Sequence, residues 1–477
     1  MTRIEKDSLG EIEVPENMLY GAFTTRASRN FQISGIRAKH EFISSIALIK
    51  KAAAIANMKL GLLDSNIGNA IVSAASGIIE GEYRDQFILD VFQAGAGTPF
   101  NMNTNEVIAN VAIKRLGGNP GDYHIIHPNN HVNMAQSSND VIPTSIRLSV
   151  LLTLPPLVRQ IEDIVTAFED KANEYESVIK VGRTHLEDAV PIRVSQVFRG
   201  YGASLSKCID RIETAKKGML ELGIGGTAIG TGINTHPDFK KMIITELNAL
   251  TGFEFYQGDS ITLSWSMASF MDMSNALRIL AIELNKISND LRLLNSGPKA
   301  GISEIILPEV EPGSSIMPGK INPSIPEAVN MVCFQVIGND HAISLAAEAG
   351  QLELNVMTPL IAYDLLWNID LLTNTIRMLR EDCIKGIVVD EKRCTELLDI
   401  SHCLATVLNP YIGYQNVAEL VKVALSENKP LKHVLLEKDI IPEKYLDEIL
   451  DTRKMTEPDV IDKRVIEEIR KYRKDPI

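Results

Sequence analysis

Apolar residues recur at intervals of three and four along most of the chain, the spacing of helices that bury one face. Residues 40–60 show this pattern among many alanines, and residues 67–79 and 103–116 show it again. Residues 1–40 lack the spacing and are punctuated by glycine and proline. We therefore expect the N-terminal segment to be irregular and the rest of the chain to be mainly helical.

Four longer helical patterns follow, at residues 144–177, 194–222, 264–294 and 326–383. A helix of this length cannot bury its apolar stripe alone, so the pattern predicts a bundle. Sustained apolar faces on long helices are also typical of an oligomer core. The predicted fold class is all-α, with a long central helix bundle between smaller, mostly helical N- and C-terminal domains. The expected domains are residues 1–139, 140–390 and 391–477.

The composition is that of a globular protein, with 45% hydrophobic and 23% charged residues. Lys and Arg number 48 against 61 Asp and Glu, and the net charge of −13 disfavours nucleic-acid binding. An anionic substrate would therefore need a locally positive pocket. Five cysteines without a Cys-x-x-Cys pair and a charged N-terminus fit a cytoplasmic protein without a signal peptide. We find no run of about 18 apolar residues, so we expect no membrane span.

The segment GSSIMPGKINP, residues 313–323, cannot form a regular element, because it holds two glycines and two prolines. Lys320 and Asn322 make a plausible grip on a carboxylate, since one supplies charge and the other directed donors. Ser314, flanked by glycine in a conformable loop, could act as a nucleophile or a base. The alternative is a solvated turn without a function.

A second polar segment, GRTHLEDA, covers residues 182–189. Its His185 lies beside a hydroxyl and two carboxylates, although a lone histidine is more often structural. Glu327 follows the glycine- and serine-rich loop at the start of a helical pattern. A His185–Glu327 pair would hold the imidazole tautomer and raise its basicity, but the sequence does not show that the two residues meet.

Two further polar loops, residues 98–105 and 136–140, contain hydroxyls and amides with almost no charge. Such side chains suit a second carboxylate, and the candidates are Thr98, Ser137, Ser138 and Asn139. The alternative is helix capping, because Ser, Thr, Asn and Asp are preferred at helix N-termini.

No metal or nucleotide motif is evident. The histidines at 124, 127 and 131 have helical spacing, but Pro128 and two asparagines interrupt a helix there, so we expect no metal site. The glycine-rich stretch 223–232 lacks both the Gly-Lys-Ser/Thr ending of a P-loop and a clear preceding strand.

These segments together resemble the aspartase/fumarase superfamily. Its signature Gly-Ser-Ser-x-Met-Pro-x-Lys-x-Asn is matched at every fixed position by residues 313–322, and its two other regions match SSND at 137–140 and GRTH at 182–185. The resemblance covers about residues 5–453. It is strongest to the aspartase branch, in phrases such as NMNTNEV (101–107) and EAGQLELNVM (348–357).

The resemblance implies a homotetramer with a helical core and active sites that are each built by three subunits. It implies a C–N lyase that eliminates ammonia from L-aspartate to give fumarate through an aci-carboxylate, without a cofactor. Its partners would be a small dicarboxylate or amino acid, and neither a nucleic acid nor a membrane.

The family roles transfer to matching positions in this chain. Ser314 resembles the base, Ser315 lies beside it in the motif, and Lys320 and Asn322 resemble the grip on the α-carboxylate. Thr184 and His185 resemble a substrate-contacting pair, with His185 held by Glu327. The β-carboxylate site is implied to consist of Thr98, Ser137, Ser138 and Asn139.

Three departures from the aspartase pattern keep alternatives open. Ser138 stands where aspartases usually have Thr, as in fumarases, so fumarate hydratase is one rival. Pro99 removes a backbone donor beside the carboxylate site, and Trp265 stands where relatives have small residues. These two positions suggest an amine-lyase on a larger, ergothionase-like substrate, although core packing is the simpler interpretation of Trp265. A structural, crystallin-like protein is disfavoured, because it would not need the retained site residues.

Overall fold

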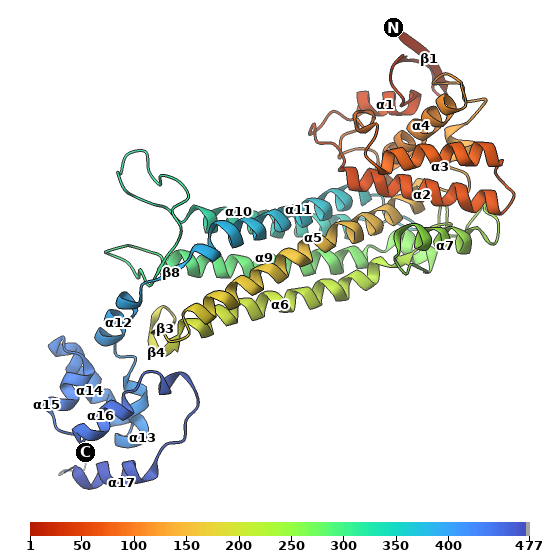
Figure 1. The fold of residues 1–477 in the computed structure, drawn as a ribbon. Coiled ribbons are helices and arrows are strands. Elements are labelled where there is room, and N and C mark those ends of the chain that lie inside the picture. Colours follow the sequence, from red (N-terminus) through yellow and green to blue (C-terminus); the bar gives the residue numbers. More distant parts are fainter. Residues whose placement is uncertain (474–477) are drawn as a thin grey trace. The chain divides into compact units, whose positions relative to one another are not determined.

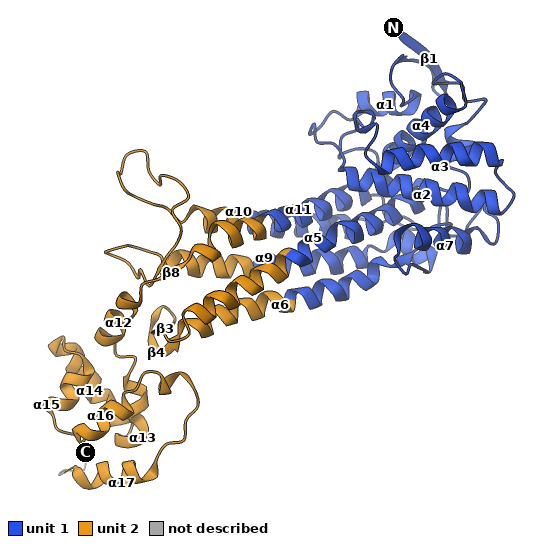
Figure 2. Cartoon of the chain, in the orientation of Figure 1, with its two compact units in different colours: residues 1–159, 208–282, 332–374 blue, residues 160–207, 283–331, 375–477 orange. Residues whose placement is uncertain are grey.

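A computed structural model describes residues 1–473 as two compact units (Figures 1 and 2). Each unit gathers three separate segments of the chain. The first unit comprises residues 1–159, 208–282 and 332–374, and the second comprises residues 160–207, 283–331 and 375–477.

Five long helices contribute segments to both units: α5 Ser138–Glu174, α6 Val194–Met219, α9 Ala268–Leu294, α10 Ser324–Glu348 and α11 Thr358–Asp382. In the first unit, Ser274 of α9 donates to Asp340 of α10, and the Arg147 guanidinium of α5 lies 4.5 Å from the Phe270 ring of α9. In the second unit, Tyr201 of α6 donates to Asp290 of α9 at 2.8 Å. The predicted bundle of long helices is thus confirmed.

The remaining elements of the first unit are β1 Thr2–Asp7, β2 Gly10–Pro15, α1 Ala22–Asn30, α2 His40–Lys59, α3 Ser65–Ile79, α4 Thr98–Arg115, β5 Glu221–Leu222, α7 Phe239–Thr251, β6 Tyr256–Gln257 and α8 Ser260–Trp265. β1 and β2 pair antiparallel, and β5 and β6 pair parallel. The expectation that residues 1–40 are irregular is wrong. Glutamates alternate with Ile12 and Val14, which point inward and are buried, and this period of two is the signature of a strand.

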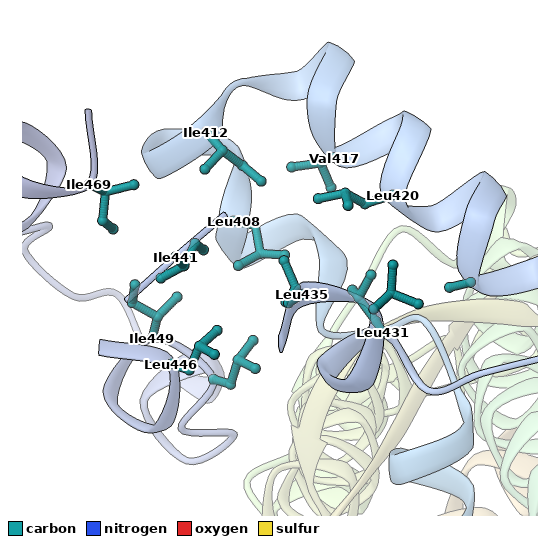
Figure 3. Close-up of a cluster of buried hydrophobic side chains, with 13 residues drawn as sticks. Leu408, Ile412, Val417, Leu420, Leu431, Leu435, Ile441, Leu446, Ile449 and Ile469 are labelled. Atoms are coloured by element: carbon teal, nitrogen blue, oxygen red, sulfur yellow. The ribbon is translucent and has the colours of Figure 1, made fainter. Parts of the chain in front are cut away.

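The remaining elements of the second unit are β3 Ile179–Thr184, β4 Glu187–Arg193, β7 Ile305–Ile306, β8 Val388–Val389, α12 Glu391–Ile400, α13 Asn409–Ile412, α14 Tyr414–Glu427, α15 Leu431–Glu437, α16 Glu443–Ile449 and α17 Lys463–Tyr472. β3 pairs with β4 and β7 with β8, both antiparallel. Figure 3 shows the core of the C-terminal helices, where Leu408, Leu420 and Leu435 pack with other buried aliphatic side chains.

Several predicted boundaries are wrong. The pattern 264–294 is broken between α8 and α9, whereas the pattern 326–383, which is too long for one typical globular helix, divides into α10 and α11. α4 begins at Thr98 instead of residue 103, and α5 begins at Ser138 instead of residue 144. The polar segments that were expected to be loops form the first helical turns.

α5 is long and apolar enough to cross a membrane by length and composition alone, with a mean hydropathy of 1.6 over an 18-residue window. However, 72% of that window is buried inside the structure. α5 therefore has the burial of a core helix.

Candidate active site

The N-termini of α4 and α5 meet in the first unit. Thr98 is the first residue of α4 and Ser138 the first of α5, and their hydroxyl oxygens lie 3.0 Å apart. A helix N-terminus carries unpaired N–H groups and a partial positive charge, so two of them at one point favour an anion. The structure therefore joins two predicted residues from loops 40 positions apart.

Gly97 makes this junction possible. Its φ of 63° is left-handed, and a β-carbon there would lie 3.0 Å from the Ile142 side chain of α5. Pro99 follows within the first turn of α4, where a missing N–H costs no helical hydrogen bond.

Ser137 and Asn139 have local structural contacts. The Ser137 hydroxyl accepts from the Asn139 backbone N–H at 3.2 Å, and the Ser137 N–H donates to Asp140 at 2.9 Å. This reciprocal pair caps α5, so the capping alternative holds for Ser137. The Asn139 side chain donates to the Ala228 carbonyl at 2.8 Å.

Asp140 anchors the glycine-rich stretch 223–232, whose role was open in the sequence. Its second carboxylate oxygen accepts from the N–H groups of Gly225 at 3.0 Å and Thr227 at 2.9 Å. Burial raises the pKa of Asp140 to about 6. The stretch therefore serves as a support for the start of α5.

Lys50, a fully buried residue of α2, is not among the residues predicted from the sequence. Its ammonium donates to side-chain oxygens of Asn101 at 2.6 Å, Asn133 at 2.8 Å and Gln136 at 2.9 Å. Burial lowers the pKa of Lys50 to about 7. One sequence signal could have identified Lys50. It is a lysine within a strongly apolar helical segment, in a chain that also has uncharged, amide-rich loops.

In the second unit, residues 313–322 fold back on themselves as an exposed loop. The Gly313 N–H donates to the Lys320 carbonyl at 3.0 Å, and the Asn322 side chain donates to the Gly313 carbonyl. A β-carbon on Gly313 would lie 2.4 Å from the Lys320 oxygen, so only glycine allows this closure.

The Ser314 hydroxyl lies inside this loop. Its oxygen accepts from the backbone N–H groups of Met317 at 3.0 Å and Ile316 at 3.3 Å. Two N–H dipoles aimed at one oxygen stabilise negative charge on it. Ser315 and Lys320 are exposed.

Thr184 and His185 lie at the tip of the β3–β4 hairpin and are exposed. His185 and Leu186 form the turn, with φ of 58° and 64°. Glu304 is fully buried and pairs at 2.9 Å each with Lys180 near the base of the hairpin and with Arg183 next to its tip. These two ion pairs fix the hairpin that presents the tip.

Glu327 lies on the first turn of α10, 3.9 Å from the Arg292 guanidinium. Within residues 1–473 of one chain, no hydrogen bond joins Glu327 to His185, so their pairing stays a prediction. Trp265 ends α8 and is 45% exposed, which does not fit the core-packing interpretation.

In the described part of the chain, no group of three or more His, Cys, Asp or Glu residues could hold a metal ion. His127 instead accepts from the N–H groups of Asn129 and Asn130, and His131 accepts from the His127 N–H. These two rings therefore act as local caps.

Comparisons with known proteins place the chain in a family. The family model described as "Lyase" matches residues 10–338, and that of the fumarase C C-terminus matches residues 404–457. Aspartate ammonia-lyase of Bacillus subtilis is 44% identical and covers 98% of both chains. The enzyme of the same name from Pseudomonas aeruginosa is 46% identical, over 96% of this chain and 98% of the relative.

Solved structures agree. A fumarate lyase:delta crystallin from Brucella melitensis superposes with a TM-score of 0.93 at 45% identity, over 96% of this chain and all of that one. A class II fumarase from Schistosoma mansoni gives 0.92 at 36% identity, over 96% and 99%. Enzymes of this kind act on small dicarboxylates and are typically oligomeric. The chain therefore belongs to the aspartase/fumarase superfamily, as a carbon–nitrogen lyase of the aspartate ammonia-lyase family.

Proposed function

We propose that the protein catalyses the reversible elimination of ammonia from L-aspartate and that the predicted residues carry it. The observation that carries this proposal is the meeting of two helix N-termini at Thr98 and Ser138. That junction suits the β-carboxylate, where negative charge grows during the reaction. Ser137 and Asn139 complete this binding site, which we call the β-carboxylate subsite.

Ser314 removes the Cβ proton. A free serine is far too weak an acid for this role, but the N–H groups of Ile316 and Met317 would stabilise its alkoxide. The electrons of the broken C–H bond move into the β-carboxylate and give a dianionic aci-carboxylate. They then return to form the C=C bond of fumarate while the C–N bond breaks and ammonia leaves. Ser314 passes its proton to solvent.

Lys320 and Asn322 hold the α-carboxylate, and Ser315 borders it. Thr184 and His185 contact the substrate from the hairpin, and Glu327 orients His185. No residue set in this proposal requires a cofactor.

We further propose a cytoplasmic homotetramer in which three subunits form each site. α10 exposes a stripe of large apolar side chains, with Met331 64%, Phe334 59% and Leu345 50% exposed, which supports burial against other subunits. The five cysteines, all within residues 1–473, are buried and form no disulfide, as expected in a reducing compartment. The three domains 1–139, 140–390 and 391–477 remain part of this proposal.

The test offers L-aspartate, L-malate and ergothioneine in parallel and follows both the unsaturated product by ultraviolet absorbance and the release of ammonia or amine. We expect fumarate and ammonia from aspartate alone. Turnover of malate or ergothioneine without aspartate would refute the assignment and make Ser138, or Pro99 and Trp265, the marks of a changed specificity.

A further inference from the structure

Lys50 is a buried cation whose three donors all go to neutral groups. Its side chain is fully buried, and each of the three N–H groups of an ammonium has one amide oxygen within 2.9 Å. No carboxylate contacts the nitrogen among residues 1–473. A buried charge without a counterion in contact is costly, so a role in stability alone does not explain it.

The three acceptors connect Lys50 to both sides of the β-carboxylate subsite. Asn101 lies one turn after Thr98 on α4, and Gln136 directly precedes Ser137. Asn133 joins these two sides, because its side-chain oxygen also accepts from Asn101 at 3.2 Å and its amide donates to the Gln136 carbonyl at 3.1 Å.

The charge of Lys50 is available to a ligand. The titratable group whose charge acts on Lys50 is Asp140, on α5. Asp140 does not contact the ammonium, and its carboxylate is occupied by the backbone N–H groups of Ser137, Gly225 and Thr227. The amides around Lys50 carry no charge of their own, so they transmit its positive potential instead of cancelling it.

We propose that Lys50 is a positioning residue of the β-carboxylate subsite: its ammonium fixes the first turns of α4 and α5 and gives this site of an acidic protein its positive charge. It acts on the substrate through Asn101, Asn133 and Gln136. The inference rests on the proposed function, since it requires a dicarboxylate at Thr98 and Ser138.

The first test compares Lys50→Met with wild type and with Lys51→Met. Lys51→Met removes the same charge from the next position of α2, outside the three-amide contact. We expect Lys50→Met to lose about 100-fold in kcat/KM, mostly in kcat because charge grows on the β-carboxylate, and about 10-fold in succinate affinity by calorimetry. Lys51→Met should stay within about 2-fold. A folded Lys50→Met variant within about 3-fold of wild type on both measures would overturn the proposal.

A second measurement keeps the test decisive if Lys50→Met does not fold. Succinate binding to the wild-type protein near pH 8 is measured in buffers of different ionisation enthalpy, which reports protons taken up on binding. If the bound succinate dianion favours the protonated form of Lys50, succinate binding should take up protons from the buffer, and the Lys51→Met variant should show the same proton uptake. The absence of proton uptake would overturn the proposal. Wild type that binds succinate in a Lys50-dependent way but does not turn over aspartate would refute the proposed function and support this inference.

Discussion

The two units carry opposite kinds of site. In the first unit, Thr98 and Ser138 are the first residues of two helices, supported by buried Lys50 and Asp140. In the second unit, Ser314 lies on an exposed loop closed by contacts of Gly313 with Lys320 and Asn322. One site is built from fixed dipoles and the other from a segment with few buried contacts.

This contrast matches two different chemical demands. Stabilising charge that grows on a carboxylate requires dipoles that do not reorganise during the reaction. A base that must approach Cβ and then release the product belongs on a segment that can open, and low-stability loops supply such motion. Substitutions at Ser314, at the Thr98–Ser138 pair and at Gly313 would break or sharpen this proposed division between a unit with the β-carboxylate subsite and a unit with the proposed base.

The largest effect is expected from Ser314→Ala. Loss of the proposed base should lower kcat by about 1000-fold, because nothing else in the loop offers an activated hydroxyl with two N–H donors. Succinate affinity and the melting temperature should stay near wild type, since the side chain packs against little. Residual turnover above about a tenth of wild type would remove Ser314 from the mechanism.

The Thr98–Ser138 pair comes next. Thr98→Val and Ser138→Ala should each cost about 10-fold in kcat/KM, and the double variant less than the product of the two, because the hydroxyls are hydrogen-bonded to each other. A double-mutant cycle on kcat/KM and on succinate affinity measures this coupling. Strict additivity would mean that the two helix N-termini act independently.

The Gly313→Ala substitution tests whether closure of the 313–322 loop affects activity without affecting the stability of the fold. A β-carbon 2.4 Å from the Lys320 oxygen must open the loop and should lower kcat/KM by about 10-fold. The melting temperature should not change, because the loop is exposed. Gly200→Ala on α6 is the control, since a β-carbon there meets nothing within 4 Å. A drop in melting temperature for Gly313→Ala would show that the loop supports the fold.

The smallest effect concerns Asp364 of α11, in the first unit. Burial raises its pKa to about 7 from 3.8, and one carboxylate oxygen has no partner within residues 1–473. The folded state therefore binds this proton more tightly than the unfolded state, and stability falls as pH rises from about 4 to about 7. Asp364→Asn should match wild type near pH 4 and be about 1 kcal/mol more stable near pH 8. Denaturant unfolding at both pH values checks this, and equal stability at pH 8 would contradict it.

The sequence predicted the long helices because an apolar stripe with a period of 3.6 is a local signal. It did not locate the break near Gly350, where the chain leaves α10. It also missed the N-terminal strands, whose alternation is only a few residues long.

The candidate site divides in the same way. Thr98, Ser138 and Ser314 could be named because polar, uncharged loops stand out from the composition. The contacts of Lys50 and Glu304 could not be predicted, because their partners lie 51 to 124 residues away in the chain and only tertiary packing brings them together. Local sequence likewise does not decide whether His185 meets Glu327.

Because the native cysteines are buried, a cysteine introduced into the loop of residues 313–322 could be labelled selectively for spectroscopy. All five thiols are buried, and burial raises the pKa of Cys333, Cys383 and Cys394 to about 12, so they should resist alkylation in the folded protein. Ile316 is 81% exposed beside Ser314. A single Ile316→Cys substitution would therefore accept a fluorophore selectively, and its emission could follow the opening and closing of the loop in real time without removal of any native cysteine.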